Sequence, residues 1–450
     1  MGNLLGAPIV DKETHRGRVD DDDIEFAVSS MQGWRVHMED AHICEPKLYA
    51  LQHKVDSNEG STMATAETTK IALPGHSLYA VFDGHGGTFA AIYSGKNMLR
   101  VLTEQAKFTE YAKFVQERPT KEPTLASDSA KKVQYLRSGL DLLEDALRDA
   151  FVEMDKEIAN AIRGTPHPLA NTPYHPEPPV VVAAAGASTD GDDDDDASNN
   201  NNNNMKDAVF DAAKEAVSAL DDEGDSGTTA CVVLVTPDWI VCANAGDSRS
   251  VCSKSGNRAV PLSYDHKPDD EEEERRIRAA GGYVAGGRVE GDLAVSRGLG
   301  DFRFKSMVTV CAGAHSATNN NNEQGSGGDR VTMAPGEQKV SSIPDIIVQN
   351  RNAEHDEFII VACDGIWDVQ SNNEFITEVA GLFQEGESDL GLLCEEVRRK
   401  KKRLWGWLYV CLYVERGTYC FRLAVSNRVV FRYLCYVIDV GYLLTIGQQR

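Results

Sequence analysis

Two short apolar runs in the chain each end in an Asp-Gly pair. Residues 78–82 lead into Asp83 and Gly84, and residues 358–363 lead into Asp364 and Gly365. A short continuous apolar run predicts a strand that is buried on both faces. The Asp then sits on a rigid support at the rim of the core, and the Gly lets a backbone carbonyl approach a bound ion. One such pair is more often a plain turn, but two in matched context suggest a shared cation site.

The remaining pattern predicts a mixture of strands and helices. Residues 24–48 and 71–95 are strand-like, and two apolar runs between residues 228 and 245 flank a Pro-Asp turn, which is typical of a hairpin. The acidic run 269–274, followed by arginines, predicts a helix start. A helix of about six turns is predicted by one apolar stripe at helical spacing: Leu136, Leu140, Leu143, Leu147, Phe151 and Met154.

Two low-complexity segments interrupt the chain. Residues 165–206 are rich in Pro, Asp and Asn, and residues 312–336 contain a second run of Asn. Such segments bury too little apolar surface to offset their ordering entropy, so we predict disordered insertions there. We interpret residues 1–24, which end in an acidic run, as a flexible lead-in, residues 25–397 as the folded domain and residues 398–450 as a separate tail.

Charge separates these parts further. The 450 residues carry a formal net charge of -24, which argues against a nucleic-acid partner because phosphate backbones require a basic surface. Acidity is compatible with carboxylates that hold divalent cations. The tail differs, because from Arg398 onward 11 Lys and Arg stand against 2 Asp and Glu. Its six consecutive basic residues could imitate a nuclear localisation signal or a patch for anionic lipid.

Targeting signals are few. Ten Cys without a C-x-x-C pair, and no secretory signal, predict reduced thiols and a cytoplasmic or nuclear protein. The tail has no run of about 18 uncharged residues, so we predict no transmembrane segment. Gly2 permits N-myristoylation and weak membrane association, although position 6 lacks the favoured Ser or Thr. We expect a monomer.

Further carboxylates accompany the two Asp-Gly pairs. Glu39 and Asp40 follow a short segment that begins at Gly33, Asp247 lies just past a predicted strand, and Asp368 lies four residues after Asp364. Mg²⁺ and Mn²⁺ prefer oxygen ligands in octahedral geometry, whereas structural zinc sites use Cys and His. Carboxylates on several strand ends therefore favour Mg²⁺ or Mn²⁺. Asp247 alone could equally begin a turn.

One arginine and two histidines are candidates for phosphate chemistry. Arg35 offers a planar fork that binds phosphate oxygens, although a lone arginine is more often a surface ion-pair partner. His85, which follows Gly84 directly, and His37 are candidate proton donors. The chain has no G-x-S-x-G elbow, no Walker loop and no G-x-G-x-x-G opening a helix. These are the central motifs of serine hydrolases, nucleotide-binding kinases and dehydrogenases, so the sequence gives little support to these three functions.

Taken together, the segments resemble the metal-dependent serine/threonine protein phosphatases of type 2C. The matching stretches occur in the order of that family and cover residues 27–396 apart from the two insertions. They are S-S-M-Q-G-W-R-V-H-M-E-D-A-H (29–42), Y-A-V-F-D-G-H-G-G (79–87), S-G-T-T-A (226–230), N-A-G-D-S-R (244–249), Y-D-H-K-P (264–268), G-G-R-V-E-G-D-L-A-V-S-R-G-L-G-D (286–301) and F-I-I-V-A-C-D-G-I-W-D-V (358–369).

The resemblance implies an α+β fold, a four-layer α/β/β/α sandwich with two mostly antiparallel central sheets flanked by helices. It also implies dephosphorylation of phosphoserine and phosphothreonine on protein substrates, by attack of a water that bridges two Mg²⁺ or Mn²⁺ ions. Arg35 would hold the substrate phosphate and His85 would protonate the leaving oxygen. The metal-site residues that it implies are Asp83 (bridging both ions), Gly84 (through its carbonyl), Asp364 (directly), Glu39 and Asp40 (through waters), and Asp247 and Asp368 (at a weaker third ion).

The C-terminal part departs from the family pattern. Members of the family carry a further metal-binding Asp, followed by Asn and a closing strand, about forty residues beyond the second Asp-Gly segment. Residues 400–415 contain no Asp, and Asp439 is not followed by Asn. We interpret the break near Glu396 as an alternative exon, a retained intron or a faulty gene model. The missing Asp leaves open a weak or inactive phosphoprotein-binding module, and a scaffold that acts through its tail is a third possibility. A lost strand would expose a sheet edge.

Overall fold

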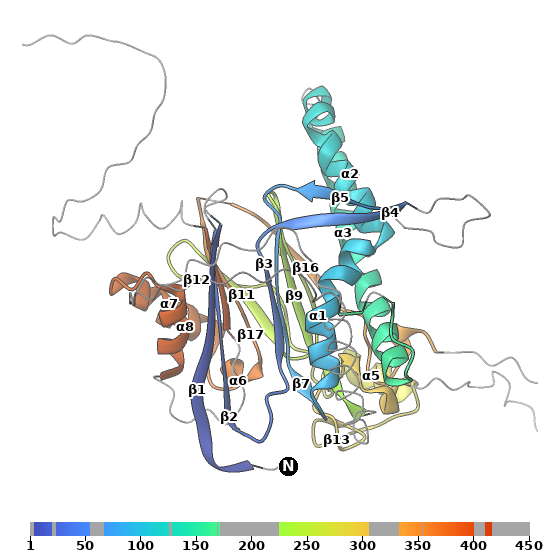
Figure 1. The fold of residues 1–450 in the computed structure, drawn as a ribbon, viewed down its shortest axis with the longest axis vertical. Helices are drawn as coiled ribbons and strands as arrows, with labels where there is room; N and C mark the ends of the chain where they lie inside the picture. The colour runs from blue at the N-terminus through green and yellow to red at the C-terminus, as the bar shows by residue number, and fades with distance from the viewer. Residues whose placement is uncertain are drawn as a thin grey trace, which may run out of the picture.

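Two antiparallel β-sheets form the centre of the protein, and helices pack against them (Figure 1). The computed structural model describes residues 4–19, 24–54, 67–125, 128–168, 170–171, 225–305, 333–352, 354–399 and 410–415. Strands and helices both contribute to these regions, as expected for the α+β class that the sequence predicts.

The larger sheet has six strands in the order β1-β2-β18-β17-β11-β12. Every neighbouring pair in it is antiparallel. The chain therefore brings segments from both of its ends into one sheet. The strands are β1 Leu4–Val19, β2 Ile24–Arg35, β11 Arg249–Lys254, β12 Arg258–Pro261, β17 Asp356–Ala362 and β18 Val410–Glu415.

The second sheet has five antiparallel strands in the order β16-β10-β9-β6-β3. Its β9 and β10 form the predicted hairpin, in which Ile240 pairs with Val235 across the turn. The strands are β3 Ala41–Glu45, β6 Ser77–Phe82, β9 Ala230–Val235, β10 Trp239–Ala245 and β16 Asp345–Asn350.

The packing of β6 on both faces explains why its sequence is apolar almost throughout. Tyr79 and Val81 point into the core between the two sheets, whereas Leu78, Ala80 and Phe82 join the core under the helices. Successive side chains of a strand face opposite sides, so a strand with a packed layer on each face needs apolar residues at every position. The predicted burial on both faces is confirmed, because all six residues of β6 are buried.

Helices cover the outer face of each sheet. Among the described helices, three share a core with the five-stranded sheet, and two long helices, together with the short α6 Asp364–Trp367, share a core with the six-stranded sheet (Figure 1). The helices of the first group are α1 Phe89–Glu104, α2 Ala106–Lys121 and α3 Ser129–Ile162, and the two long helices of the second are α7 Asn372–Gln384 and α8 Leu390–Arg399. Helix α1 corrects the strand-like interpretation of residues 71–95, because its first residues, which are apolar, pack as one face of a helix.

The long helix α3 confirms the predicted apolar stripe. Leu143, Leu147, Phe151 and Met154 are fully or almost fully buried in the core under the helices. The Asp128 side chain accepts a hydrogen bond of 3.1 Å from the backbone N–H of Lys131 and so caps the first turn. The spacing of the apolar residues therefore predicted correctly which face of α3 is buried.

Shorter elements complete the described chain. The predicted helix start at the acidic run is α5, with its arginines in the last turn. The other elements are β4 Leu48–Lys54 with β5 Glu67–Leu73, β13 Val284–Ala285 with β14 Arg288–Val289, the three-stranded sheet of β7 Gly84–His85, β8 Gly227–Thr228 and β15 Leu299–Gly300, helices α5 Glu271–Ala279 and α6 Asp364–Trp367, and the 3₁₀ turns η1 Glu122–Leu125, η3 Phe302–Phe304 and η4 Pro335–Glu337.

The N-terminal residues correct one prediction. Residues 1–24 were expected to be a flexible lead-in, but residues 4–19 form β1, which pairs along β2. Lys12 Nζ donates a hydrogen bond of 2.8 Å to the backbone carbonyl of Glu395, and Arg16 Nε donates one of 2.7 Å to Asp389 Oδ1. Main-chain pairing and polar contacts with the α8 region hold this edge strand, and neither leaves a hydrophobic pattern in the sequence.

The tail corrects a second prediction. Loss of the closing strand was expected to expose a sheet edge, but β18 lies between β17 and β2 and pairs antiparallel with both. A segment of the tail thus completes the centre of the larger sheet. Residues 400–409 and 416–450, most of both insertions, and Gly2 lie outside the described residues.

Two further observations concern membranes and thiols. Within the described residues, no helix is long and apolar enough to cross a membrane. The six described cysteines with placed side chains, Cys44, Cys231, Cys242, Cys252, Cys363 and Cys394, are free thiols.

The buried His76 predicts a loss of stability in acid. Its Nδ1–H donates 2.8 Å to the carbonyl of Pro74, so Nε2 accepts from the Tyr111 hydroxyl at 2.8 Å and the ring is neutral. Burial lowers the pKa of His76 to about 4 from its usual 6.5. Between these values the unfolded chain binds the proton more tightly, so the contribution of His76 to stability falls as the pH drops from 6.5 towards 4, by roughly 3 kcal/mol in all.

Urea unfolding of the wild type and His76→Gln between pH 7 and 4 checks this prediction. The variant should lose part of the acid-dependent decline, and His355→Gln, which removes an exposed histidine, is the matched control. An identical decline in the wild type and in His76→Gln would show that His76 does not contribute.

Candidate metal and phosphate site

The two Asp-Gly pairs lie where buried strands end. Asp83 follows β6 directly, and Asp364 is the first residue of the short helix α6, separated from β17 by Cys363 alone. Strands β6 and β17 belong to different sheets and contribute to the same intersheet core. The packing of the two sheets therefore brings both carboxylates to one edge of the core.

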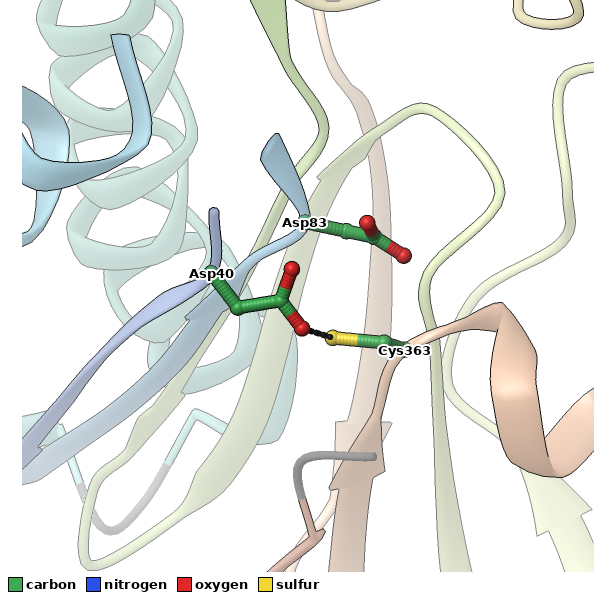
Figure 2. A group of neighbouring side chains, drawn as sticks. All are labelled: Asp40, Asp83 and Cys363. Carbon is green, nitrogen blue, oxygen red and sulfur yellow. Dashed lines mark hydrogen bonds between the residues drawn. The ribbon is translucent and has the colours of Figure 1, made fainter. Parts of the chain in front are cut away.

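Three side chains at this edge form a compact cluster of candidate ligands. One ligand atom each from Asp40, Asp83 and Cys363 lies within 4.8 Å of the others (Figure 2). The Cys363 thiol donates a hydrogen bond of 3.3 Å to Asp40 Oδ2. The other oxygen, Asp40 Oδ1, is buried without a hydrogen-bond partner among the described residues. A buried carboxylate oxygen with no donor is costly unless a cation or another group satisfies it.

The electrostatics of the cluster point the same way. Burial, opposed by the hydrogen bond from Cys363 and reinforced by the nearby Asp364 carboxylate, raises the pKa of Asp40 to about 7. Burial, followed by Asp247 and Asp368, raises the pKa of Asp364 to about 6. Burial and repulsion from Asp40 and Asp364 also raise the pKa of Asp83 well above its usual range. The carboxylates repel one another, so a positive charge placed among them would be favourable.

The donor set fits a hard divalent cation. The carboxylate oxygens are the ligands that Mg²⁺ and Mn²⁺ prefer. Burial and the neighbouring carboxylates raise the pKa of the Cys363 thiol well above its usual value, so it stays protonated and serves as a donor to Asp40. A zinc site would require the thiolate. The residues present therefore favour Mg²⁺ or Mn²⁺ over Zn²⁺.

Glu39 and Gly84 lie beside the cluster. A Cβ atom at Gly84 would stand 2.0 Å from the backbone carbonyl oxygen of Glu39, so only glycine permits this close approach. Burial raises the pKa of Glu39, and the charge of Arg35 opposes this rise. Gly84 thus lets the strand end with Asp83 pack against the segment that carries Glu39 and Asp40.

Arg35 is the last residue of β2, at the rim of the carboxylate group. Its guanidinium lies 3.9 Å from Glu39 Oε2, and its side chain is 44% exposed. The charge of Arg35 also lowers the pKa values of Asp40, Asp83 and Asp364 against the dominant effect of burial. Because the guanidinium is exposed, an anion from solution can reach it, and its planar fork suits phosphate oxygens.

His85 lies two residues after Asp83, in β7, and faces a partner that the sequence did not reveal. Its Nε2 lies 2.9 Å from Oδ1 and 3.0 Å from Oδ2 of Asp301. Burial disfavours the imidazolium ion, but the Asp301 carboxylate outweighs burial and raises the pKa of His85 above its usual 6.5. Asp301 ends the segment 286–301, which was quoted above for its resemblance to the family, and that resemblance was the available signal.

Asp247 and Asp368 belong to a neighbouring group that contains a lysine. Lys267 Nζ donates 2.6 Å to Asp247 Oδ2. Burial lowers the pKa of Lys267, but its ion pair with Asp247 outweighs burial and raises it. Burial raises the pKa of Asp368, which Lys267 lowers and Asp247 raises. Lys267 was not predicted as a site residue, although it lies in the Y-D-H-K-P segment.

The sequence profile of the protein phosphatase 2C family matches residues 24–170 and 182–403, well over half of the chain. This chain belongs to the protein phosphatase 2C family. The match ends at residue 403, close to the predicted break near Glu396, and β18 lies beyond it.

Curated members of the protein phosphatase 2C family cover most of the chain. It is 30% identical over 397 residues to protein phosphatase 2C homolog 2 of Aspergillus flavus, a match that covers 88% of this chain and 62% of the relative. It is also 30% identical over 400 residues to a probable protein phosphatase 2C of Caenorhabditis elegans, covering 88% of this chain and 73% of that protein. The chain thus spans less than two thirds of the Aspergillus relative.

Solved structures agree on the fold. A phosphatase from Toxoplasma gondii superposes with a TM-score of 0.52 at 17% identity, covering 90% of this chain and 95% of that one. A serine-threonine phosphatase 2C from the same organism gives a TM-score of 0.51 at 16% identity, covering 91% and 98%. At this identity the likeness concerns the arrangement of strands and helices.

Proposed function

We propose that the chain removes phosphate from phosphoserine and phosphothreonine on proteins in a reaction that requires Mg²⁺ or Mn²⁺. The observation that carries this proposal is the cluster of Asp40, Asp83 and Cys363, in which a buried carboxylate oxygen has no hydrogen-bond partner in the part of the chain that the structure describes. Membership of the protein phosphatase 2C family supports the same reaction.

We propose that the site binds two Mg²⁺ or Mn²⁺ ions, and that a third ion binds beside them with lower affinity. Asp83, Gly84, Asp364, Glu39 and Asp40 would hold the pair. Bound there, Mg²⁺ or Mn²⁺ would supply a water that ionises near neutral pH and would offset the negative charge of the phosphoryl oxygens.

The third ion would be held by Asp247 and Asp368. Lys267 already places one positive charge on Asp247, which supports the weaker affinity of that position.

The protein side chains supply binding and a proton. Arg35, exposed at the rim, would bind the phosphate oxygens through its planar fork and orient the phosphorus towards the carboxylate cluster. His85 would then protonate the serine or threonine oxygen as it leaves, since an alkoxide is a poor leaving group. A positioned general acid of this kind is worth roughly 10²–10⁴-fold in rate.

The proposed architecture is the four-layer α/β/β/α sandwich. Three packed cores support it: one between the five-stranded sheet and its helices, one between the sheets, and one between the six-stranded sheet and α7 with α8. This arrangement places β6 and β17 in the two inner layers, with the carboxylates at their ends.

A catalytically weak or inactive phosphoprotein-binding module is the second candidate. The observation that favours it is the absence of any Asp in residues 400–415, where the family carries a metal-binding Asp. Fewer carboxylates would weaken ion binding and change the acidity of the bound water. Arg35 would still bind a phosphorylated segment.

Turnover and binding of one phosphoseryl peptide distinguish the two functions. The purified chain of 450 residues is mixed with the peptide in saturating Mn²⁺, and free phosphate and bound peptide are both measured. Release of many phosphates per protein supports the enzyme. Binding of the peptide without release supports the module, and neither signal rejects both.

A substitution at His85 tests its role as the acid. His85→Gln should lower kcat on a phosphoseryl peptide by roughly 10²-fold or more, because the leaving alkoxide needs a proton. The same variant should slow an aryl phosphate much less, since a nitrophenolate leaves without protonation. The measurement is kcat for both substrates, and an equal loss on both would contradict the acid role.

Location and assembly remain proposals. We propose a monomer in the cytoplasm or nucleus that acts on phosphorylated proteins and has no nucleic-acid partner. Myristoylation of Gly2 would add weak membrane association.

A further inference from the structure

The small sheet of β7, β8 and β15 joins two side chains that are far apart in the sequence. His85 ends β7, and Asp301 follows β15 directly. Both strands pair with β8, so β8 separates the two residues. Across it, both carboxylate oxygens of Asp301 lie within hydrogen-bond distance of His85 Nε2, at 2.9 Å and 3.0 Å. The Asp301 side chain is 2% exposed.

A glycine in the middle strand makes this contact possible. Gly227 pairs with His85 on one side and with Gly300 on the other. A Cβ atom at Gly227 would lie 2.3 Å from each of three carboxyl atoms of Asp301. No side chain fits in that space. Because Gly227 has no Cβ, the Asp301 carboxylate can lie over β8 and contact His85.

The backbone of Asp301 is held in an unfavourable conformation. Its φ of 53° and ψ of 39° lie in the left-handed region, which is unfavourable for a residue other than glycine. The backbone N–H of Asp301 donates a hydrogen bond of 3.1 Å to the carbonyl of Ser226. Asp155 Oδ1 accepts from the N–H of Gly300 at 2.8 Å and from Lys305 Nζ at 2.7 Å, and both Asp155 and Lys305 are buried. A buried ion pair thus fixes the loop that presents the carboxylate.

This arrangement determines which ring nitrogen is available. A carboxylate only accepts hydrogen bonds when ionised, so Nε2 of His85 carries a proton that it donates to Asp301. Nδ1 is then the nitrogen left to exchange a proton with a substrate. A carboxylate behind a catalytic imidazole selects the tautomer and orientation of the ring in this way.

We propose that Asp301 is a positioning residue, which holds the His85 ring so that Nδ1 faces the leaving oxygen. The proposal rests on the proposed function, because it assigns His85 the role of acid. Asp301 itself touches no reacting atom. Its effect passes through the imidazole and therefore depends on how much the leaving group needs a proton.

The variant Asp301→Asn tests this role. Asn has nearly the same shape and tolerates the left-handed backbone, so the fold is kept, whereas the negative charge is lost. We expect kcat on a phosphoseryl peptide to fall about 10-fold to 100-fold, which does not exceed the roughly 10²–10⁴-fold that a general acid is worth, and KM to stay within about threefold. An aryl phosphate with a good leaving group should lose less than about threefold.

Two controls define the result. Asp292→Asn, which alters an exposed ion pair with Arg303 in the same region, should leave both substrates unaffected. The double variant Asp301→Asn with His85→Gln should be no slower than His85→Gln alone, because the two residues act as a unit. Multiplied losses in the double variant, or equal losses on both substrates, would overturn the proposal.

A readout without turnover separates this proposal from the proposed function. Ring ¹⁵N chemical shifts of His85 should show a proton on Nε2 in the wild type and a redistribution towards Nδ1 in Asp301→Asn. If the wild type releases no phosphate, the proposed function fails, and these shifts still decide whether Asp301 sets the tautomer. Unchanged shifts in the variant would overturn the positioning role.

Discussion

Asp83→Asn should abolish phosphate release at saturating Mn²⁺, a loss of more than about 1,000-fold in kcat. The negative charges of Asp40 and Asp364 both act on Asp83, since both raise its pKa. A neutral amide in its place removes a negative charge that a divalent cation needs, while the shape of the side chain hardly changes. The measurement is phosphate release from a phosphoseryl peptide across a series of Mn²⁺ concentrations.

The same variant should change stability in two opposite ways. Without metal, Asp83→Asn should unfold at a higher temperature than the wild type, because repulsion within the cluster is relieved. With Mn²⁺, the wild type should gain about 2.7 kcal/mol at a concentration of 100 times Kd, and the variant should gain little. Asp141→Asn, on the exposed face of α3, is the matched control. Full activity of Asp83→Asn would contradict the metal-holding role.

Removal of β18 should unfold the protein. Five residues of β18 pair with β17 and six pair with β2. Backbone hydrogen bonds in such a ladder are each worth about 1 kcal/mol net, so loss of the strand is comparable with the whole stability of a domain, about 5–15 kcal/mol. A chain that ends after Arg399 should therefore show no cooperative urea transition, and the edges of β2 and β17 should promote aggregation.

The matched control is a chain that ends after Glu415. It retains β18 and should unfold cooperatively. Circular dichroism during urea unfolding compares the three proteins directly. If the chain that ends after Arg399 unfolds at the same midpoint as the one that ends after Glu415, β18 does not occupy the centre of the sheet.

The sequence was most informative where packing imposes a pattern on consecutive residues. Strand β6 is apolar at every position because its two faces meet different cores, and α3 carries one stripe because only one face is buried. The Asp at the end of β6 was therefore visible as a carboxylate at the rim of a core. The proximity of Asp40 to Asp83 did not follow from pattern, because β3 and β6 had to be paired first.

Elements held by polar contacts left no comparable signal. Strand β1 relies on main-chain pairing and on ion pairs such as that of Arg16 with Asp389, so its sequence resembles an exposed segment. The contact of His85 with Asp301 is made across β8, in a sheet of three strands of two residues each, which are too short for any periodicity. The ion pair of Lys267 with Asp247 likewise depends on a loop that returns to the site.

A Mn²⁺ titration of phosphate release by the purified chain of 450 residues tests the central claim most directly. The substrate is a phosphoseryl peptide, and excess EDTA defines the metal-free baseline. We predict that phosphate release rises from that baseline, saturates with Mn²⁺ and returns to the baseline when EDTA is added. Release that is absent at every Mn²⁺ concentration, or that is equally fast in EDTA, would contradict a metal-dependent phosphatase.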